Sequence, residues 1–156
     1  MHPNVAKVTE AASPHGIRVE AMEFPEGTRT ADDAARALAC DVGQIVKSLV
    51  FLLDGSPVIA LVSGANRLDE AHLAAALGGE SVGRADADAV RAATGFSIGG
   101  VPPFGHPSAL PTAIDEDLLT FHVVWAAAGT PHHVFPISPG DLVQATGGGV
   151  HRLKAG

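Results

Sequence analysis

The pattern of apolar and polar positions is strongest in the middle of the chain. Two apolar runs, residues 45–53 and residues 58–63, flank the turn-forming segment Asp54-Gly55-Ser56-Pro57. Apolar runs of this length on either side of turn residues predict a β-hairpin. The sequence therefore predicts two paired strands between residues 45 and 63.

Lys47 is the only charged residue within the first apolar run. Burying an ammonium group without a partner costs several kcal/mol, so a lysine in such a run normally reaches an anion, a ligand or water. The alternative is a lysine at a sheet edge whose ammonium group extends into solvent, and the run alone does not separate the two. Ser48 follows directly, and the pleat of a strand turns two successive side chains to opposite faces. Both residues are candidates for a ligand site.

Outside the hairpin, segments with helix-capping residues alternate with short apolar segments. Thr30, Asp86 and Ser138 stand where an N-cap is expected, and Pro139 follows at a first helical position. The predicted helices cover residues 4–12, 30–40, 69–77, 86–94 and a segment starting at 138, and the further strands cover 18–24, 112–114, 121–127 and 133–137. This order indicates an α+β fold with a mixed or antiparallel, barrel-like sheet surrounded by short helices.

Length and composition predict a single folded domain over residues 1–156. The sequence is 46% hydrophobic and 17% charged, which is typical of a compact protein. Its formal net charge of −7 excludes a protein that coats nucleic acid with a broad basic surface, although one or two cations can still form a local anion site. The single cysteine and the lack of a signal or membrane-spanning apolar run predict a cytoplasmic protein with no membrane partner, and a monomer by default.

A second unusual segment is rich in glycine and proline. It consists of Gly99, Gly100, Val101, Pro102 and Pro103, together called the Gly-Pro loop. The glycines allow the backbone to approach a ligand, and the prolines stiffen the end of the segment. The loop is either a wall for a small polar substrate or an ordinary tight connection. It lacks the Gly-x-x-x-x-Gly-Lys pattern of a phosphate-binding loop.

Three other positions are candidate site residues with a structural alternative. Asn66, followed by Arg67, could contact a ribose or phosphate, or could simply introduce the next helix. His106 follows the Gly-Pro loop and is either a pocket residue or a structural histidine. Asp141 stands three residues after Ser138, a spacing that favours helix capping over catalysis.

The sequence predicts no metal site and no cofactor. His132 and His133 are adjacent, so a strand would turn them to opposite faces and make them a poor pair of ligands. Cys40 ends a predicted helix without an evident activating partner. The Gly-x-Ser-x-Gly elbow of many serine hydrolases is absent from the sequence.

Three segments together resemble a known family. They are residues 42–51 (Val-Gly-Gln-Ile-Val-Lys-Ser-Leu-Val-Phe), residues 95–105 around the Gly-Pro loop, and residues 110–115 (Leu-Pro-Thr-Ala-Ile-Asp). In this order they resemble the YbaK/ProX family, stand-alone relatives of the editing domain inserted in bacterial prolyl-tRNA synthetases. The resemblance covers about residues 30–142 and implies the fold of that prolyl-tRNA synthetase-associated domain.

The resemblance implies an aminoacyl-tRNA deacylase that acts in trans. Members hydrolyse the ester between a wrong amino acid and the 3′-terminal adenosine of tRNA, with Cys- or Ala-tRNA(Pro) as familiar substrates. Lys47 matches the family's key lysine, which makes it the implied catalytic residue, and the Gly-Pro loop matches the family's Gly-x-x-x-Pro loop. Ser48 and Asn66 are further candidate substrate contacts, chosen for their positions in the sequence. Members use no metal, and a ribose hydroxyl of the tRNA takes part in catalysis; a synthetase partner stays open.

One segment departs from the family pattern. Many members carry an acidic residue in the strand that follows residues 121–127, whereas this chain has Val134 there, after the segment Ala126-Ala127-Ala128-Gly129-Thr130-Pro131-His132-His133. Lys47 therefore lacks an acidic companion on that strand. The departure keeps an alternative open, a binding module for a nucleotide or aminoacyl-adenosine that has lost turnover. The identity of the amino acid is likewise left open by the sequence.

Overall fold

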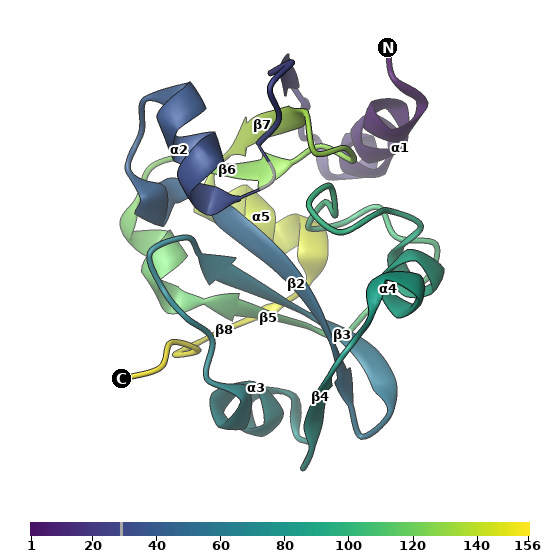
Figure 1. The fold of residues 1–156 in the computed structure, drawn as a ribbon, viewed down its shortest axis with the longest axis vertical. Coiled ribbons are helices and arrows are strands. Elements are labelled where there is room, and N and C mark those ends of the chain that lie inside the picture. The colour runs from purple at the N-terminus through teal and green to yellow at the C-terminus, as the bar shows by residue number, and fades with distance from the viewer. Residues whose placement is uncertain (29) are drawn as a thin grey trace.

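The structure is a computed structural model that describes residues 1–28 and 30–156 (Figure 1). Its helices are α1 (Pro3–Ala12), α2 (Ala31–Leu38), α3 (Glu70–Leu77), α4 (Ala87–Thr94) and α5 (Pro139–Thr146), with 3₁₀ helices at Ser13–His15, Val42–Gln44 and Glu116–Thr120. Its strands are β1 (Met22–Glu23), β2 (Val46–Leu53), β3 (Ser56–Ser63), β4 (Val82–Arg84), β5 (Thr112–Asp115), β6 (Val124–Ala127), β7 (His133–Ile137) and β8 (Gly149–His151). Short helices thus surround the strands, as the sequence predicts.

The predicted hairpin is confirmed as β2 and β3. The two strands pair antiparallel from Val46 with Ser63 to Leu53 with Ser56. The turn consists of Asp54 and Gly55, whose φ angles are 50° and 87°. Positive φ at both central residues is the geometry of a tight two-residue turn whose twist matches the strands it joins. This turn fixes the register that places Lys47 opposite Val62.

The strands form two sheets. The larger sheet has the order β4-β2-β3-β5-β8 and is mixed, because β3, β5 and β8 run parallel while β2 runs antiparallel to β3 and β4. The smaller sheet has the order β1-β7-β6. Among the described residues, one isolated bridge, between Ile45 and Trp125, pairs the two sheets. The α+β class with a mixed sheet is confirmed, but the strands do not close into a barrel, because in the described part of the chain β6 pairs with the β2 side only through the isolated bridge of Trp125 with Ile45.

The larger sheet is buried on both faces, which explains why β3 reads as a continuous apolar run. One face contributes Val46, Val50 and Ile59 to the main core, together with side chains from α1, α4, α5 and the smaller sheet. The opposite face packs Val62 and its neighbours against Leu73 of α3, the helix below the sheet in Figure 1. Residues of β2 therefore alternate between two differently lined spaces.

Local signals fix the helix ends where the sequence predicts them. The side chains of Thr30, Asp86 and Ser138 each accept a hydrogen bond from the backbone N–H three residues later. Gly95 and Gly147 follow α4 and α5 in the left-handed conformation, with φ of 80° and 67°. Within residues 1–28 and 30–156, no helix is both long enough and apolar enough to cross a bilayer.

Several predicted boundaries are wrong. The strand expected at 18–24 is reduced to β1, which pairs with β7 through Met22 and Glu23 only. The strand expected at 121–127 begins at Val124, because the 3₁₀ helix Glu116–Thr120 and a bend precede it. The sequence did not predict β4 or β8, since each is three residues long, contains glycine, and is a strand only through its pairing with β2 or β5.

Candidate active site

A cavity of about 520 Å³ opens beside β2. Its lining comes from β2, from β6, from the start of α2, from α4 and from the loop that follows α4. The cavity lies where the two sheets fail to join, because β4 pairs with residues 51–53 of β2 and β6 pairs with that side through one isolated bridge, at Ile45. The first half of β2 therefore borders a space rather than a neighbouring strand.

The backbone of Ser48 faces this open edge. The carbonyl of Ile45 accepts a hydrogen bond from Gly64 N at 2.7 Å, on the side of β3. Backbone groups of successive residues alternate between the two edges of a strand, so Ser48 directs its N–H and C=O away from β3. The cavity therefore has main-chain donors and acceptors in its wall as well as side chains.

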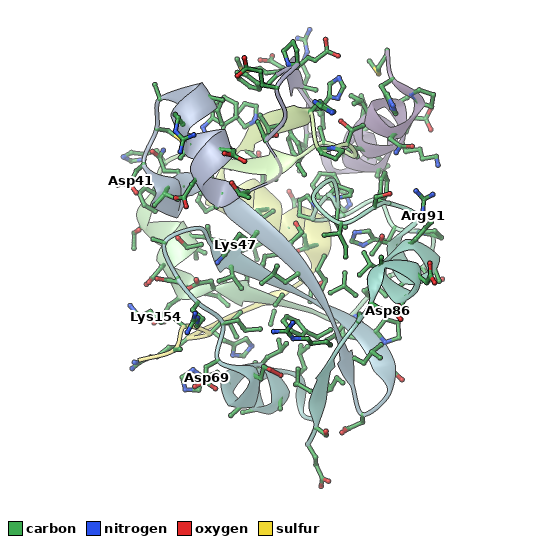
Figure 2. All side chains as sticks on the ribbon, in the orientation of Figure 1. Asp41, Lys47, Asp69, Asp86, Arg91 and Lys154 are labelled. Atoms are coloured by element: carbon green, nitrogen blue, oxygen red, sulfur yellow. The ribbon has the colours of Figure 1, made fainter. Side chains whose placement is uncertain are left out.

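Lys47, which the sequence marks as a candidate ligand-site residue, lies on β2 in the cavity wall. Its half-buried side chain extends toward the loop after β3, where Nζ donates a hydrogen bond to the backbone carbonyl of Asn66 (Figure 2). Burial lowers the pKa of the Lys47 ammonium group, the negative charge of Asp115 opposes this shift, and the positive charge of Arg67 adds to it. Lys47 thus presents a partly desolvated positive charge whose position is fixed.

A buried polar network positions the carbonyl that Lys47 binds. Asp115, at the end of β5, is completely buried, and its Oδ2 accepts hydrogen bonds from Ser63 N at 3.0 Å and Asn66 Nδ2 at 2.8 Å. Asn66 Nδ2 also lies 2.8 Å from Asp117 Oδ2, which in turn accepts from Lys154 Nζ at 3.0 Å. These hydrogen bonds lower the pKa of the Asp117 carboxyl group, and the bond from Asn66 contributes most, followed by the bond from Lys154. The acidic companion missing from the strand that holds Val134 is therefore supplied by β5, through Asn66.

The roles of the predicted polar residues follow from this network. The side chain of Asn66 is bound to two carboxylates and does not line the cavity, so the geometry favours positioning of Lys47 over direct contact with a ribose. Ser48 does line the cavity. Its Oγ is buried and has no hydrogen-bond partner among the described residues.

The Gly-Pro loop contributes both lining and support. Gly99, with φ of 91°, and Val101 line the cavity, whereas Gly100, Pro102 and Pro103 are buried behind them. A Cβ on Gly100 would lie 2.7 Å from Cα of Thr130, in the turn between β6 and β7. The loop is therefore packed against backbone at a distance that only glycine permits.

His106 supports this loop from the other side. Its Nε2 lies 2.8 Å from the carbonyl oxygen of Pro102, and burial lowers the pKa of the imidazole, which that hydrogen bond partly opposes. His106 lines a separate cavity of about 260 Å³ with Pro103 and Phe104. The structure thus brings His106 to the loop but not to the Lys47 cavity.

Asp141 lies away from both cavities in the first turn of α5. Its backbone N–H donates to Ser138 Oγ at 3.1 Å, and its own side chain is exposed. This arrangement matches the capping spacing that the sequence shows.

Sequence reasoning did not identify three residues around the cavity. Trp125 of β6 and the exposed Arg84 of β4 line it, and the buried Asp115 supports Lys47 from behind. The sequence could have indicated Asp115, because it ends an apolar strand and a buried carboxylate is costly unless it is paired or hydrogen-bonded. Arg84 had none, because the strand that carries it was not predicted. In the described part of the chain, no three His, Cys, Asp or Glu side chains are arranged to hold a metal ion.

Comparison with known proteins identifies the family. Residues 25–145 match the aminoacyl-tRNA editing domain. EbsC of Enterococcus faecalis, provisionally named a Cys-tRNA(Pro)/Cys-tRNA(Cys) deacylase, is 28% identical over 137 residues, covering 86% of this chain and 84% of that protein. The proline–tRNA ligase of Streptococcus sanguinis is 30% identical over 142 residues, or 88% of this chain, which spans only 23% of the ligase.

A solved structure agrees with this assignment. A protein described as a candidate trans-editing enzyme for prolyl-tRNA synthetase superposes with a TM-score of 0.93 at 44% identity, covering 100% of this chain and 99% of that one. The family and fold that the sequence resemblance implied are thereby confirmed, and with them the class of enzyme, an aminoacyl-tRNA deacylase. The chain belongs to the aminoacyl-tRNA editing domain family.

Proposed function

We propose that the chain hydrolyses, in trans, the ester that joins a wrongly attached amino acid to the 3′-terminal adenosine of tRNA, with Lys47 as the catalytic residue. The observation that carries this assignment is the fixed ammonium group of Lys47 at a cavity that the Gly-Pro loop also lines. The relatives' names make proline tRNA charged with cysteine the first substrate to test.

In this reaction a water oxygen bonds to the ester carbonyl carbon and the bond from that carbon to the ribose oxygen breaks. The proton lost by water ends on the ribose oxygen, and the family resemblance assigns the relay to a neighbouring ribose hydroxyl. Negative charge develops on the carbonyl oxygen, and a preorganised cation stabilises such charge most strongly where water is partly excluded. Lys47 meets this requirement, because Asn66 holds it and burial desolvates it.

Different sides of the cavity contact different parts of the substrate, the aminoacyl group and the phosphates of the acceptor end. Gly99 and Val101 bring backbone and an apolar surface to the aminoacyl group, and orientation of this kind can supply much of the rate enhancement. The exposed guanidinium group of Arg84 lies at the lining of the same cavity and offers a positive charge to phosphates of the acceptor end. Local cations allow an acidic protein to bind the end of an RNA without a broad basic surface.

The test is deacylation of a panel of mischarged tRNAs, with Cys-, Ala- and Ser-tRNA(Pro) among them. Lys47→Ala should lower kcat/KM by at least about a hundredfold, the scale of loss of one transition-state cation or donor. Lys7→Ala is the matched control, because Lys7 lies on α1 over the ring of Phe96 and does not line the cavity. Arg84→Ala should raise KM more than it lowers kcat, since its contact is with the RNA.

Full activity of a folded Lys47→Ala variant would overturn the assignment of this residue. Tight binding of aminoacyl-adenosine without hydrolysis of any charged tRNA would instead identify a binding module. The proposed substrate places the activity in the cytoplasm, where tRNAs are charged, and it requires no metal or cofactor. A monomer and a complex with a synthetase stay predictions, and size-exclusion chromatography with and without prolyl-tRNA synthetase tests both.

A further inference from the structure

We infer that the cationic side chains of Arg67, Arg152 and Lys154, here called the basic rim, bind backbone phosphates of the tRNA acceptor stem. This inference rests on the proposed function and concerns the RNA outside the cavity. All three residues lie outside the lining of both cavities, and the side chains of Arg67 and Arg152 are exposed.

The C-terminal segment brings these residues to the loop after β3. Leu68 and Lys154 form an isolated antiparallel bridge. Ala155 N donates a hydrogen bond to the carbonyl oxygen of Arg67 at 2.8 Å. Leu153 is fully buried in the core on the α3 side of the sheet and anchors the segment. The segment lies beyond residue 145, where the match to the editing domain ends, so the family match by itself assigns it no role.

A short chain of hydrogen bonds connects the basic rim to the catalytic lysine. Lys154 Nζ donates to Asp117 Oδ2 at 3.0 Å, and the same oxygen accepts from Asn66 Nδ2 at 2.8 Å. The backbone carbonyl of Asn66 in turn accepts from Lys47. Figure 2 shows both lysines beside the loop after β3. The basic rim therefore continues the positive charge of Lys47 from the cavity wall toward solvent.

The positive charge of the rim is only partly compensated. Among the described residues, neither Arg67 nor Arg152 forms an ion pair with a carboxylate. Hydrogen bonds contribute most to the lowered pKa of Asp117, and the positive charge of Arg152 adds to them. Burial contributes most to the lowered pKa of Lys47, and the positive charge of Arg67 adds to it. Both arginines thus lie close enough to act on the network that holds Lys47.

A polyanion is the ligand that this arrangement fits. Lys47 and the basic rim contain four of the ten Lys and Arg residues of a chain whose formal net charge is −7. Like charges gathered at one place repel one another, and a bound anion relieves that repulsion. Guanidinium groups can bind phosphate through two parallel hydrogen bonds. Arg152 donates to the backbone oxygen of Gly156, which leaves further N–H groups of its guanidinium for a phosphate.

The proposed substrate supplies such a polyanion beside Lys47. When its esterified 3′ end lies in the cavity, the phosphates of the adjoining stem are the nearest anions outside it. Phosphate contacts carry no sequence information, so the rim should strengthen binding of every charged tRNA alike.

The experiment compares a full tRNA with a substrate that lacks the stem. The wild type and the double variant Arg67→Gln/Arg152→Gln receive the same aminoacyl ester on tRNA(Pro) and on the trinucleotide CCA. We expect KM for the tRNA to rise about tenfold with kcat unchanged, whereas both constants for the trinucleotide stay the same. For the tRNA, the slope of log kcat/KM against log salt concentration should become shallower by about one to two, because two phosphate contacts are lost.

Two further double variants serve as controls. Lys7→Gln/Arg18→Gln removes the same charge from exposed positions on and after α1, which lies at the opposite end of the molecule from the C-terminus (Figure 1). It should leave KM and the salt slope for the tRNA at their wild-type values. Arg67→Lys/Arg152→Lys keeps the charge and should keep most of the salt slope. All of these positions are exposed, so the thermal midpoints should agree with that of the wild type.

Two outcomes would overturn the inference while the enzyme stays active. An equal loss on the tRNA and on the trinucleotide would mean that the arginines act at Lys47 rather than on the stem. An unchanged KM and salt slope for the tRNA would mean that the rim does not contact the RNA.

The proposed function fails in a different way. If the wild type deacylates no charged tRNA beyond the Lys47→Ala background, the proposed function is overturned, and binding of uncharged tRNA(Pro) decides the role of the rim. Fluorescence anisotropy should then give a Kd that is about tenfold higher for Arg67→Gln/Arg152→Gln than for the wild type. Equal Kd values, or no binding by the wild type, would overturn the inference as well.

Discussion

The two walls of the cavity are held in place by different kinds of interaction. On the β2 wall, Lys47 is fixed by a chain of hydrogen bonds through Asn66 to the buried carboxylate of Asp115. On the wall formed by the Gly-Pro loop, Gly100 is fixed by close packing against the backbone of Thr130. A polar network therefore positions the charge of Lys47 on one side of the cavity. On the other side, close packing positions the backbone of the Gly-Pro loop.

This difference predicts two ways to damage the enzyme. Disturbing the polar network should misplace a charge and reduce the rate of the chemical step. Disturbing the packing should displace the loop and weaken orientation of the aminoacyl group. Substitutions in each wall test whether the two are independent, beginning with the larger effect on stability.

Asp115→Asn should have the largest effect on the β2 wall. The carboxylate accepts from Ser63 N, Asn66 Nδ2 and Asp117 N, so an amide in its place turns an NH₂ group toward a donor. We expect the free energy of unfolding to fall by about 3 kcal/mol, in the range for breaking a buried charged network. Urea denaturation measures the stability loss, and kcat of the folded fraction should fall because Lys47 loses its fixed partner.

Asp141→Asn is the matched control for this substitution. The Asp141 side chain is exposed on α5 and lies outside both cavities, so its loss of charge should change stability by no more than about 0.5 kcal/mol. A large loss of deacylation in this variant would restore the catalytic interpretation of Asp141. If Asp115→Asn loses stability but keeps its full kcat, the network does not position Lys47.

Gly100→Ala tests the opposite wall. The added Cβ would lie 2.7 Å from Cα and 2.8 Å from the carbonyl carbon of Thr130, both backbone atoms that cannot rotate away. The loop must shift, at a cost of about 1–3 kcal/mol in stability, and a displacement of this size can lower kcat/KM by about a hundredfold. Steady-state kinetics with Cys-tRNA(Pro) measures the loss.

Gly140→Ala provides the control, because a Cβ there meets nothing within 4 Å. It should leave activity unchanged and stability equal or slightly higher. Wild-type activity in Gly100→Ala would show that the loop tolerates displacement and that the β2 wall alone determines the rate. Equal damage to kcat from Gly100→Ala and Asp115→Asn, with KM unchanged in both, would show that the two walls act as one unit.

The sequence predicted the β2 wall better than the loop wall. Lys47 is evident as a charge within an apolar run, and the turn at Asp54 fixes its register through local interactions. Glycine and proline content singled out the Gly-Pro loop and the family resemblance assigned it to the site, but the need for glycine at position 100 arises from Thr130, thirty residues away. No local pattern reports such a contact, because it depends on how the loop packs against the turn between β6 and β7.

The same reasoning explains the missed and reassigned residues. The family pattern places an acidic companion of Lys47 near Val134. In the structure the carboxylate comes instead from Asp115 of β5, which is linked to Lys47 by hydrogen bonds through Asn66. Parallel pairing of β3 and β5 brings that carboxylate to Asn66, and parallel pairing between distant segments leaves no turn signal in the sequence. Strands of three residues, such as β4 with Arg84, are missed because their pairing partner creates them.

The smallest effect concerns pH and separates the charge on the β2 wall from its placement. Burial lowers the pKa of Lys47 below its ordinary value of 10.5, so the free enzyme loses the ammonium proton at a lower pH than an exposed lysine would. If the charged form is required, kcat/KM, corrected for spontaneous ester hydrolysis, should decline as pH rises through this lowered pKa.

The stability of the fold should change in the opposite sense. Between the lowered pKa and 10.5 the unfolded chain binds more protons than the folded chain, so this group makes the free energy of unfolding rise with pH. Lys47→Arg keeps its charge throughout this range, so whatever activity it retains should lack the alkaline decline, while an unchanged decline would assign the titration to a group other than Lys47.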